Sequence, residues 1–597
     1  MGIGPSSKGA ILNIIKPLPI EKVRKMYKPN KKHLQPPLIS NVQALPDKHR
    51  QRLEQSWAGE FYRQFFCRLK EQPFACLYAD LPSRPNIPVN VLVALDTLKA
   101  GFGWSDEELY DHFSFDVQVR YALGYHNLAE GDFDIRTLYN FRRRLSQYNL
   151  EHGVNLLEAC FEDITDQQVI AFKVKTDQQR MDSTMIASNI LDSSRLQLAA
   201  ELLQRIERLL SETDRARYAE RLAPYLKDTV NQYVYRIKGK QRVAEELTQI
   251  GQLLYTLLQE LSSGYAQHPF LPVVERFFAE NFQGEEAAVQ PVDGQDLSSG
   301  CLQSLDDLEA SYRQKGPRFY KGFTANLSET CNPENELQLV TKVQTKPNNV
   351  DDADLLIAAL PNLAQRTDLK QLYTDGGYGS PDADPVLRAQ QVEQIQTAIR
   401  GTRLNPAKLH LSAYVILQDE QGQATQITCP QGYTVPVQPT PSHKSFLARF
   451  DPADCAQCPF HAEDRCRILW RKRCAKFQMD FTQQEVDAAV RRRRCLENKQ
   501  ATRNLRAAVE ALMRSIKHPF SGGKLPVRGL RRVEDMLIGS AAMVNIRRIT
   551  RYRQEKNHLK TEKERPESAW FRFRQHLQSL CSRLLGGVRL QLSVFCC

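Results

Sequence analysis

The chain has 597 residues, of which 42% are hydrophobic, and its formal net charge is +12. This length exceeds that of one ordinary domain, so we expect about two to four domains with buried cores. No run of roughly 18 or more apolar residues occurs, which argues against a membrane-spanning helix, and we expect no secretory signal at the start. The 14 cysteines are therefore expected to be reduced thiols, a few of them as metal ligands.

Basic residues are concentrated in three segments, 1–50, 491–506 and 551–597. One basic segment is commonly solvated surface, but three in one chain favour a polyanionic partner, with nucleic acid as the first candidate. Residues 1–55 are rich in Pro and Lys without sustained periodicity, and we interpret them as a flexible basic arm. Residues 556–597 are interpreted as a basic C-terminal tail.

Helices are predicted throughout residues 56–165. In "GFGWSDEEL" one helix ends and the next begins, because Ser105 and Glu108 have the spacing of a capping box. The segment "DFDIRTLYNFRRRL" predicts another helix. Its apolar side would consist of Leu138, Phe141 and Leu145, and its cationic cluster of Arg142, Arg143 and Arg144. Two interpretations stay open, a DNA-docking domain with a basic recognition helix and a helical packing domain with an exposed arginine cluster.

Residues 166–555 predict an α/β domain with a mixed sheet. Residues 168–188 are interpreted as a strand that ends near Asp182, residues 318–347 as two paired strands, and "LKQLYTDGGYG" as a buried strand with its exit loop. The segment "DDADLLIAALPNLA" between them predicts a helix.

Two insertions interrupt this pattern, a polar helical one at about 191–310 and a Cys-rich one at about 401–480. Further helices are predicted over residues 482–517 and 530–553.

Two aspartates that are remote in sequence follow apolar strand-like segments, Asp182 in "RMDSTMIASN" and Asp375 in "LYTDGGYGSP". Aspartate at such a place is commonly a turn or cap residue, but the glycines after Asp375 allow close approach of backbone or ligand. The two carboxylates would meet only if their strands are neighbours in one sheet.

A third acid, Glu510, lies on the predicted helix "RNLRAAVEALMRSIKHP". At ~100° per residue, one side of this helix carries Arg503, Arg506, Glu510, Arg514 and Lys517. An ordinary amphipathic helix with i,i+4 ion pairs has the same pattern. The functional interpretation is that three acids hold Mg²⁺, which prefers oxygen ligands, and that the cations hold DNA phosphates.

The blocks "MDSTMIASN", "YTDGGYGSP" and R-x₃-E-x₆-K, in this order, resemble the three catalytic blocks of bacterial insertion-sequence transposases of the DDE class. The last block is similar to the Y-x₂-R-x₃-E-x₆-K signature at Arg506, Glu510 and Lys517, and departs from it at Arg503, which stands in place of the tyrosine. The similarity covers roughly residues 60–190 and 318–555.

This resemblance implies an RNase H-like catalytic domain and a DNA transposase, which cleaves at the ends of its insertion sequence and transfers the 3′-OH ends to target DNA. Asp182, Asp375 and Glu510 would be catalytic and bind two Mg²⁺ (or Mn²⁺) ions. The expected partner is double-stranded DNA, as terminal inverted repeats and as target, bound by a homodimer at the bacterial nucleoid in the cytoplasm, with no membrane partner. The expected DNA-binding residues are Arg142, Arg143, Arg144, Arg503, Arg506, Arg514 and Lys517. Glu497 lacks flanking cations at the required spacing and is ranked below Glu510.

The Cys-rich insertion contains a candidate structural Zn²⁺ site, because a CxxC pair with two further cysteines has suitable ligand chemistry. Its members are Cys429, Cys455, Cys458 and Cys466. Buried reduced thiols are the alternative. For the whole chain, two alternatives to a transposase stay open, a nuclease of the same fold and a catalytically inactive DNA-binding or regulatory relic.

Overall fold

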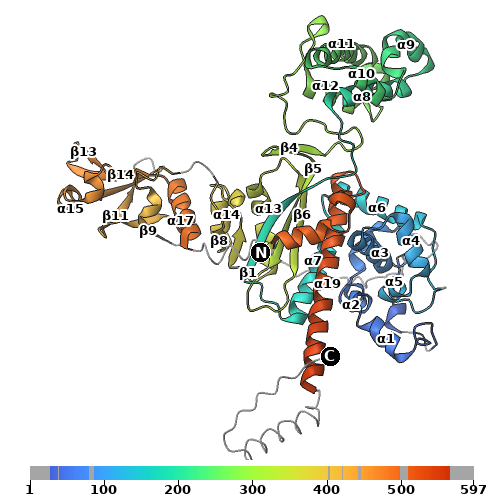
Figure 1. Cartoon of the computed structure of the whole chain (residues 1–597), viewed down its shortest axis with the longest axis horizontal. Helices are drawn as coiled ribbons and strands as arrows, with labels where there is room; N and C mark the ends of the chain where they lie inside the picture. The colour runs from blue at the N-terminus through green and yellow to red at the C-terminus, as the bar shows by residue number, and fades with distance from the viewer. Residues whose placement is uncertain are drawn as a thin grey trace, which may run out of the picture.

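The computed structural model describes residues 27–35, 37, 39–79, 86–128, 130–400, 404–419, 421–440, 445–472, 474–497 and 509–564. A sheet lies at the centre, with the N-terminal helices (blue) at its right, a helical lobe (green) above it and a small β lobe (orange) at its left (Figure 1). Among the helices of these residues, none combines the length and the apolar character required to cross a membrane.

The N-terminal lobe is helical, as predicted. Its helices are α1 (Asp47–Glu54), α2 (Trp57–Gln64), α3 (Val89–Phe102), α4 (Asp106–Phe115), α5 (Val117–Ala122), α6 (Arg136–His152) and α7 (Leu156–Phe172). Gly103 ends α3 in the left-handed region at φ 75°, a conformation that glycine adopts without strain. The predicted capping box is confirmed, because the Ser105 Oγ accepts from the Glu108 N–H at 3.1 Å and a Glu108 carboxylate oxygen accepts from the Ser105 N–H at 2.7 Å. Leu138, Phe141 and Leu145 are the buried side of α6, also as predicted.

The central sheet is mixed, which confirms the predicted α/β class. Its strands are β1 (Gln178–Ile186), β4 (Ser311–Lys315), β5 (Arg318–Thr330), β6 (Val340–Pro347), β7 (Gln371–Thr374) and β8 (Glu393–Gln396). The order is β4-β5-β1-β7-β8, and β6 pairs with β5 as well. Strand β5 is antiparallel to β1, β4 and β6, whereas β1, β7 and β8 are parallel.

Helices cover both faces of this sheet. Met181 of β1 packs in one core cluster with α13 (Asp352–Arg366), and Ile186 packs in another with α19 (Leu530–Glu564). Successive side chains of a strand point to opposite faces, so residues 181 and 186 face different layers. The sheet therefore lies between α13 on one face and α19 on the other.

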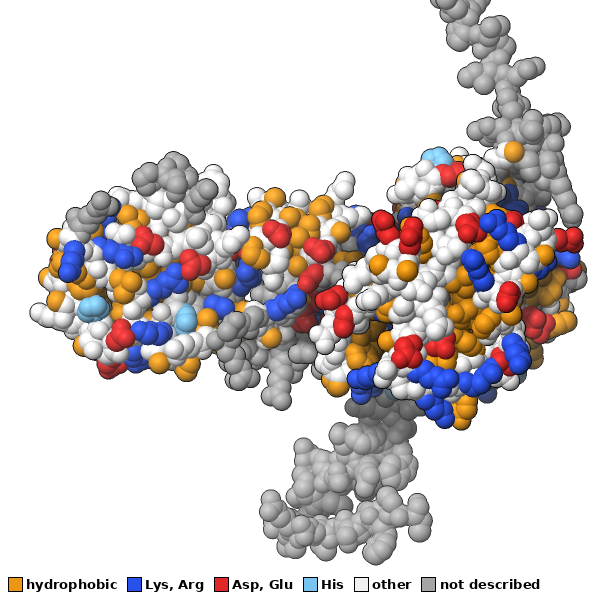
Figure 2. Space-filling model, turned by 90° about the horizontal axis from the view of Figure 1, so that it is seen from above, with side chains coloured by type: hydrophobic (Ala, Val, Ile, Leu, Met, Phe, Trp, Pro, Cys, Tyr) orange, Lys and Arg blue, Asp and Glu red, His pale blue; other side chains and the backbone are white. Residues whose placement is uncertain are grey.

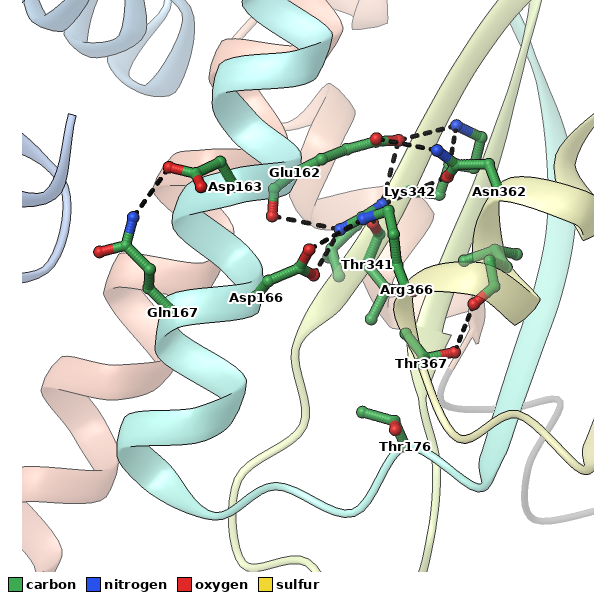
Figure 3. Close-up of polar contacts among 12 residues, drawn as sticks. Glu162, Asp163, Asp166, Gln167, Thr176, Thr341, Lys342, Asn362, Arg366 and Thr367 are labelled. Atoms are coloured by element: carbon green, nitrogen blue, oxygen red, sulfur yellow. Dashed lines mark hydrogen bonds and ion pairs between the residues drawn. The ribbon is translucent and has the colours of Figure 1, made fainter. Parts of the chain in front are cut away.

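Helix α7 is attached to the sheet by a buried ionic network (Figure 3). The Lys342 ammonium of β6, whose side chain is 8% exposed, donates to Glu162 at 2.7 Å and to Glu158 at 3.0 Å. Arg366 at the end of α13 binds Asp166 of α7 at 2.6 Å. A buried cation is costly unless it is paired, so these contacts fix α7 across β6 and α13.

The predicted strand at 168–188 is wrong in its first part, because residues 168–172 belong to α7. The buried residues Phe161, Ile164 and Gln168 recur every three or four positions in that helix, and a short apolar run does not by itself distinguish a helix end from a strand. Asp182 consequently lies within β1 and not at its end.

The insertion after β1 is helical, as predicted, and has its own apolar core. Its helices are α8 (Arg195–Leu209), α9 (Glu212–Leu226), α10 (Val230–Arg236), α11 (Lys240–Tyr265) and α12 (Leu271–Asn281), followed by a short hairpin of β2 (Phe282–Gln283) and β3 (Gln290–Pro291).

The Cys-rich segment forms a second six-stranded sheet, which the sequence did not predict. Its strands are β9 (Val415–Gln418), β10 (Ala424–Thr428), β11 (Thr434–Pro439), β12 (Phe446–Phe450), β13 (Leu469–Arg471) and β14 (Lys476–Phe481), and its helices are α15 (Pro452–Ala456) and α16 (Pro459–Ala462). Helix α14 (Ala383–Ala389) precedes β8, and α17 (Gln483–Glu497) follows the small sheet. Residues 509–517 are helical, and α19 extends beyond its predicted end.

Candidate active site

Strands β1 and β7 are parallel neighbours, which is the condition under which the two predicted aspartates could meet. Gln178 pairs with Gln371, and Arg180 pairs with Tyr373. Continuing this register puts Asp182 level with Asp375, the residue that follows β7. Two acids that are remote in the sequence therefore lie level with each other, Asp182 within β1 and Asp375 directly after β7.

The glycines after Asp375 are required by close packing at this end of the sheet. The Asp375 Oδ1 accepts from the Gly377 N–H at 2.8 Å and so fixes a tight turn. A Cβ on Gly376 would lie 2.8 Å from the carbonyl oxygen of Ala398. A Cβ on Gly377 would lie 2.8 Å from the Asp352 Oδ2 and 3.0 Å from the Asp375 Oδ1. Glycine at 377 thus lets the backbone approach both carboxylates closely.

Asp352, which the sequence analysis did not single out as a site residue, is the third acid in this place. It is the first residue of α13, and its Oδ1 accepts from the Ser183 Oγ of β1 at 2.7 Å. The sequence contained one signal for Asp352, because it is an acidic residue at the start of the predicted helix that precedes the strand of Asp375 in the chain. Its partners could not be identified without the fold, because Ser183 is 169 residues away in sequence.

The charges of neighbouring acids act on Asp182. Burial, together with the charges of Asp375 and Asp352, raises the pKa of Asp182 to about 6. Burial also raises the pKa of Asp352, which the Ser183 hydrogen bond and the Arg313 guanidinium oppose. Ser183 and Asp182 are successive residues of β1, so Asp352 lies on the face opposite to the one toward which Asp182 points.

Glu510 lies on the face of the sheet toward which Asp182 points. Val509, Leu512 and Ile516 share a core cluster with Ile186, and Asp182 is on the same side of β1 as Ile186 because four residues separate them. Glu510 itself is exposed. Within the described part of the chain, no group of three or more His, Cys, Asp or Glu side chains is placed to share one metal ion. The structure thus aligns Asp182 with Asp375 but does not bring Glu510 together with them as a metal site.

The predicted DNA-binding residues near Glu510 have different environments. Arg514 is exposed, and burial lowers the pKa of Lys517. Arg503 and Arg506 lie outside the described residues.

The arginine cluster of α6 is only partly available to a ligand. Arg142 binds Asp96 at 2.6 Å and Asp106 at 2.7 Å, and these charges raise its pKa against the effect of burial. The Arg142 guanidinium therefore joins α6 to α3 and α4, and a phosphate contact at Arg142 stays a prediction. Arg144 stacks on Tyr78 with its guanidinium 4.6 Å from the ring centre, and Arg143 is exposed.

The four predicted zinc ligands line one pocket of the small β lobe. They are Cys429, Cys455, Cys458 and Cys466, and all four are free thiols. Burial and the neighbouring thiols raise the pKa of Cys455 to about 12. The Tyr414 hydroxyl lies 3.5 Å from the Cys466 Sγ. The fold therefore gathers these thiols from three segments, although as described above they do not surround one point as metal ligands.

Comparison with known families gives one match. Residues 428–550 match the model of a family described as a transposase DDE domain. The matched segment contains Glu510 and the cysteine pocket but begins after Asp182 and Asp375. No curated protein and no solved structure matches the chain. The family match supports a DDE transposase, an enzyme class that acts on DNA.

Proposed function

We propose that the protein is a bacterial insertion-sequence transposase that cleaves DNA at the ends of its element and transfers the 3′-OH ends to target DNA. The observation that carries this proposal is the register of β1 and β7, which aligns Asp182 with Asp375. The strand order β6-β5-β1-β7-β8, antiparallel up to β1 and parallel after it, supports an RNase H-like domain. The family match, which includes Glu510, supports the same assignment.

The donor type fits Mg²⁺ or Mn²⁺, because Asp182 and Asp375 are half-buried and offer carboxylate oxygens at one level of adjacent strands. Asp182 and Asp375 would hold the metal, with Glu510 as the third ligand. Two bound ions would stabilise the charge on the attacking and leaving oxygens at phosphorus. The chain's own cations would bind the DNA backbone, and the exposed Arg143 and Arg514 are the best placed of those predicted.

Basic side chains of the small β lobe could add to this contact. Lys and Arg are spread over the lobe at the left of Figure 2. Within it, Arg449 belongs to β12, between Cys429 and Cys455 in sequence, and Arg492 belongs to α17, after the last of the four cysteines. Terminal inverted repeats and target DNA are the proposed ligands, bound by a homodimer because two ends must be joined.

The test is DNA cleavage by the full-length protein on a fragment that carries an end of its element. Asp182→Asn and Asp375→Asn should lower Mg²⁺-dependent cleavage by more than about 100-fold, while DNA binding measured by gel shift stays within about twofold. The matched control is Asp354→Asn, an exposed acid in the first turn of α13, which should cleave like the unmodified protein.

The same assay separates the alternatives. Cleavage without joining of 3′-OH ends to a target plasmid would identify a nuclease of the same fold. DNA binding without any cleavage, equal in the unmodified protein and in Asp182→Asn, would identify a DNA-binding relic. Either outcome would refute the transposase proposal.

We also propose that the cysteine pocket holds a structural Zn²⁺, because four reduced thiols that line one pocket are the ligand type zinc prefers. Metal analysis of the purified protein should find zinc. Its absence from protein produced with zinc in the medium would refute this part of the proposal without affecting the carboxylate site.

A further inference from the structure

Strands β4 and β5 form a hairpin that continues past the end of β1. Strand β4 lies at the upper end of the sheet in Figure 1, and Lys315 pairs with Arg318 across the turn at the hairpin tip. Gly322 marks the place where β5 passes β1, because a Cβ on Gly322 would lie 2.4 Å from the carbonyl oxygen of Ile186, the last residue of β1. The hairpin therefore begins where β1 ends.

The base of the hairpin is fixed to the loop that follows β6. The Asn348 Oδ1 accepts from the Ser311 Oγ of β4 at 2.9 Å, and the Asn348 Nδ2 donates to the Tyr320 carbonyl oxygen of β5 at 2.9 Å. The Arg313 Nη1 donates to the carbonyl oxygens of Asn348 and Val350. Because one amide side chain binds both strands, the hairpin is held in one direction relative to the sheet.

The tip of the hairpin carries two exposed cations directly opposite each other. Residues that pair in antiparallel strands share one face, so the Lys315 and Arg318 side chains lie side by side. Neither has an ion pair with an acid among the residues that the structure describes. The Tyr312 and Phe319 rings stack across the two strands with their centres 5.8 Å apart, which stiffens the tip. Like charges in directly opposed positions are unfavourable, and an anion bound between them would relieve their repulsion.

The cationic face of the hairpin lies beside the candidate active site. The Arg313 guanidinium is 4.0 Å from the Asp352 Oδ2. Lys315 is two residues further along β4, so its side chain is on the same face as that of Arg313. Burial raises the pKa of Asp182, and the Lys315 charge opposes this rise, so the ammonium lies within electrostatic range of Asp182. An anion held at the tip would therefore be close to the predicted catalytic aspartates.

We infer that the tip of the β4–β5 hairpin is a DNA-binding element, in which Lys315 and Arg318 bind backbone phosphates next to the phosphate that is cleaved. This inference rests on the proposed function and deepens it, because it assigns the contact that holds the DNA strand beside Asp182. Charge complementarity selects the ligand, since DNA presents closely spaced phosphates along its backbone. Basic side chains also shield an edge strand such as β4 from pairing with other chains, and that role alone would leave DNA binding unchanged.

DNA binding without catalysis is the first test. Fluorescence anisotropy of the full-length protein with a duplex that carries an end of its element is measured in magnesium-free buffer at several NaCl concentrations. Lys315→Ala and Arg318→Ala should each lower the slope of log affinity against log salt by about 1, and the double variant by about 2. The double variant should also bind about tenfold or more weakly at low salt. The matched control is Lys370→Ala, an exposed cation directly before β7 and thus at the other end of that strand from Asp375, which should change neither quantity.

The position of the contact on the DNA is the second test. Neutral methylphosphonate groups replace single phosphates of the duplex, one position at a time. At the contacted phosphates the replacement should weaken binding of the unmodified protein but not of the Lys315→Ala/Arg318→Ala variant. These phosphates should adjoin the position at which the unmodified protein cleaves when Mg²⁺ is added. Thermal unfolding checks that each variant is folded.

The inference is overturned if the double variant keeps the affinity and the salt dependence of the unmodified protein, which would mean that the two cations only shield β4. It is also overturned if the phosphates that respond to the double variant are remote from the cleavage position. In both cases the proposed function stands as long as the unmodified protein cleaves the duplex and Asp182→Asn does not. If the unmodified protein does not bind or cleave the duplex, the proposed function is refuted together with the inference.

Discussion

Replacing Asp182 by Asn should stabilise the metal-free protein at neutral pH. The pKa of this carboxyl is about 6 in the folded chain, raised by burial and by two neighbouring acids, whereas an unfolded aspartate titrates near 3.9. The folded state therefore holds the proton more tightly than the unfolded state does. Its contribution to stability is fully present below about pH 4 and is lost as the pH rises through about 6.

The size of the effect follows from the difference between these two pKa values. A difference of about two units corresponds to about 3 kcal/mol at 1.36 kcal/mol per unit. Asn has nearly the same shape and keeps an oxygen for the Ser183 N–H, which donates to the Asp182 Oδ1 at 2.8 Å. The variant should therefore gain about 2–3 kcal/mol at pH 7.5 and almost nothing at pH 4.

The assay is thermal or urea unfolding of full-length protein in magnesium-free buffer, repeated between pH 4 and pH 8. Asp354→Asn serves as the control, because its exposed position should give no pH-dependent difference. Addition of Mg²⁺ should stabilise the unmodified protein more than Asp182→Asn. An Asp182→Asn protein that is no more stable at pH 7.5, or a gain that does not shrink toward pH 4, would refute the electrostatic account of the pocket.

Four further outcomes follow from the contacts described above. Arg142→Met should destabilise the protein by about 3 kcal/mol in urea unfolding, because it leaves the partly buried Asp96 without its cation and Asp106 with Lys99 alone; a change below about 1 kcal/mol would contradict this. Arg143→Ala should leave stability within about 0.5 kcal/mol but weaken DNA binding in fluorescence anisotropy, more at low salt than at high salt; unchanged affinity would exclude Arg143 from the interface. Lys342→Met should cost about 3 kcal/mol and make α7 more sensitive to protease, since Glu158 loses its cation and Glu162 keeps Arg366 alone, and equal protease sensitivity would argue against the role of the network in Figure 3. Cys455→Ser should abolish bound zinc in metal analysis, whereas Cys474→Ser, at an exposed position outside the pocket, should retain it; equal zinc in both would contradict the pocket.

Local patterns in the sequence predicted several elements correctly, because their determinants are close together in the chain. The capping box at Ser105 depends on residues three apart, and the apolar side of α6 on a regular helical spacing. The sequence analysis also stated the condition under which Asp182 and Asp375 would meet. The apolar segments before them would have to be neighbouring strands of one sheet. Only the fold could show that β1 and β7 pair in the required register.

The errors of the sequence analysis involve partners that are distant in the chain. Arg142 was interpreted as part of an exposed cationic cluster, but its partner Asp96 is 46 residues away and Asp106 is 36 residues away. Asp352 was not singled out, since its partner Ser183 is 169 residues away in sequence. Residues 168–172 were assigned to a strand because a short apolar run fits both structures.

Buried charges elsewhere in this sheet are paired at shorter distances than Asp352 is. Glu329, which is fully buried, is bound by Arg180 at 2.7 Å and by Arg548 at 2.6 Å, and Lys342 of β6 is bound by two glutamates. The opposite charges come from β1 and from helices packed on the sheet, Arg548 of α19 and the two glutamates of α7. Asp352 is paired with Arg313 at 4.0 Å, and burial with the charges of Asp375 and Asp352 raises the pKa of Asp182. An unfavourable arrangement of this kind is expected where function needs it, and a divalent cation from solution is the partner that would neutralise it.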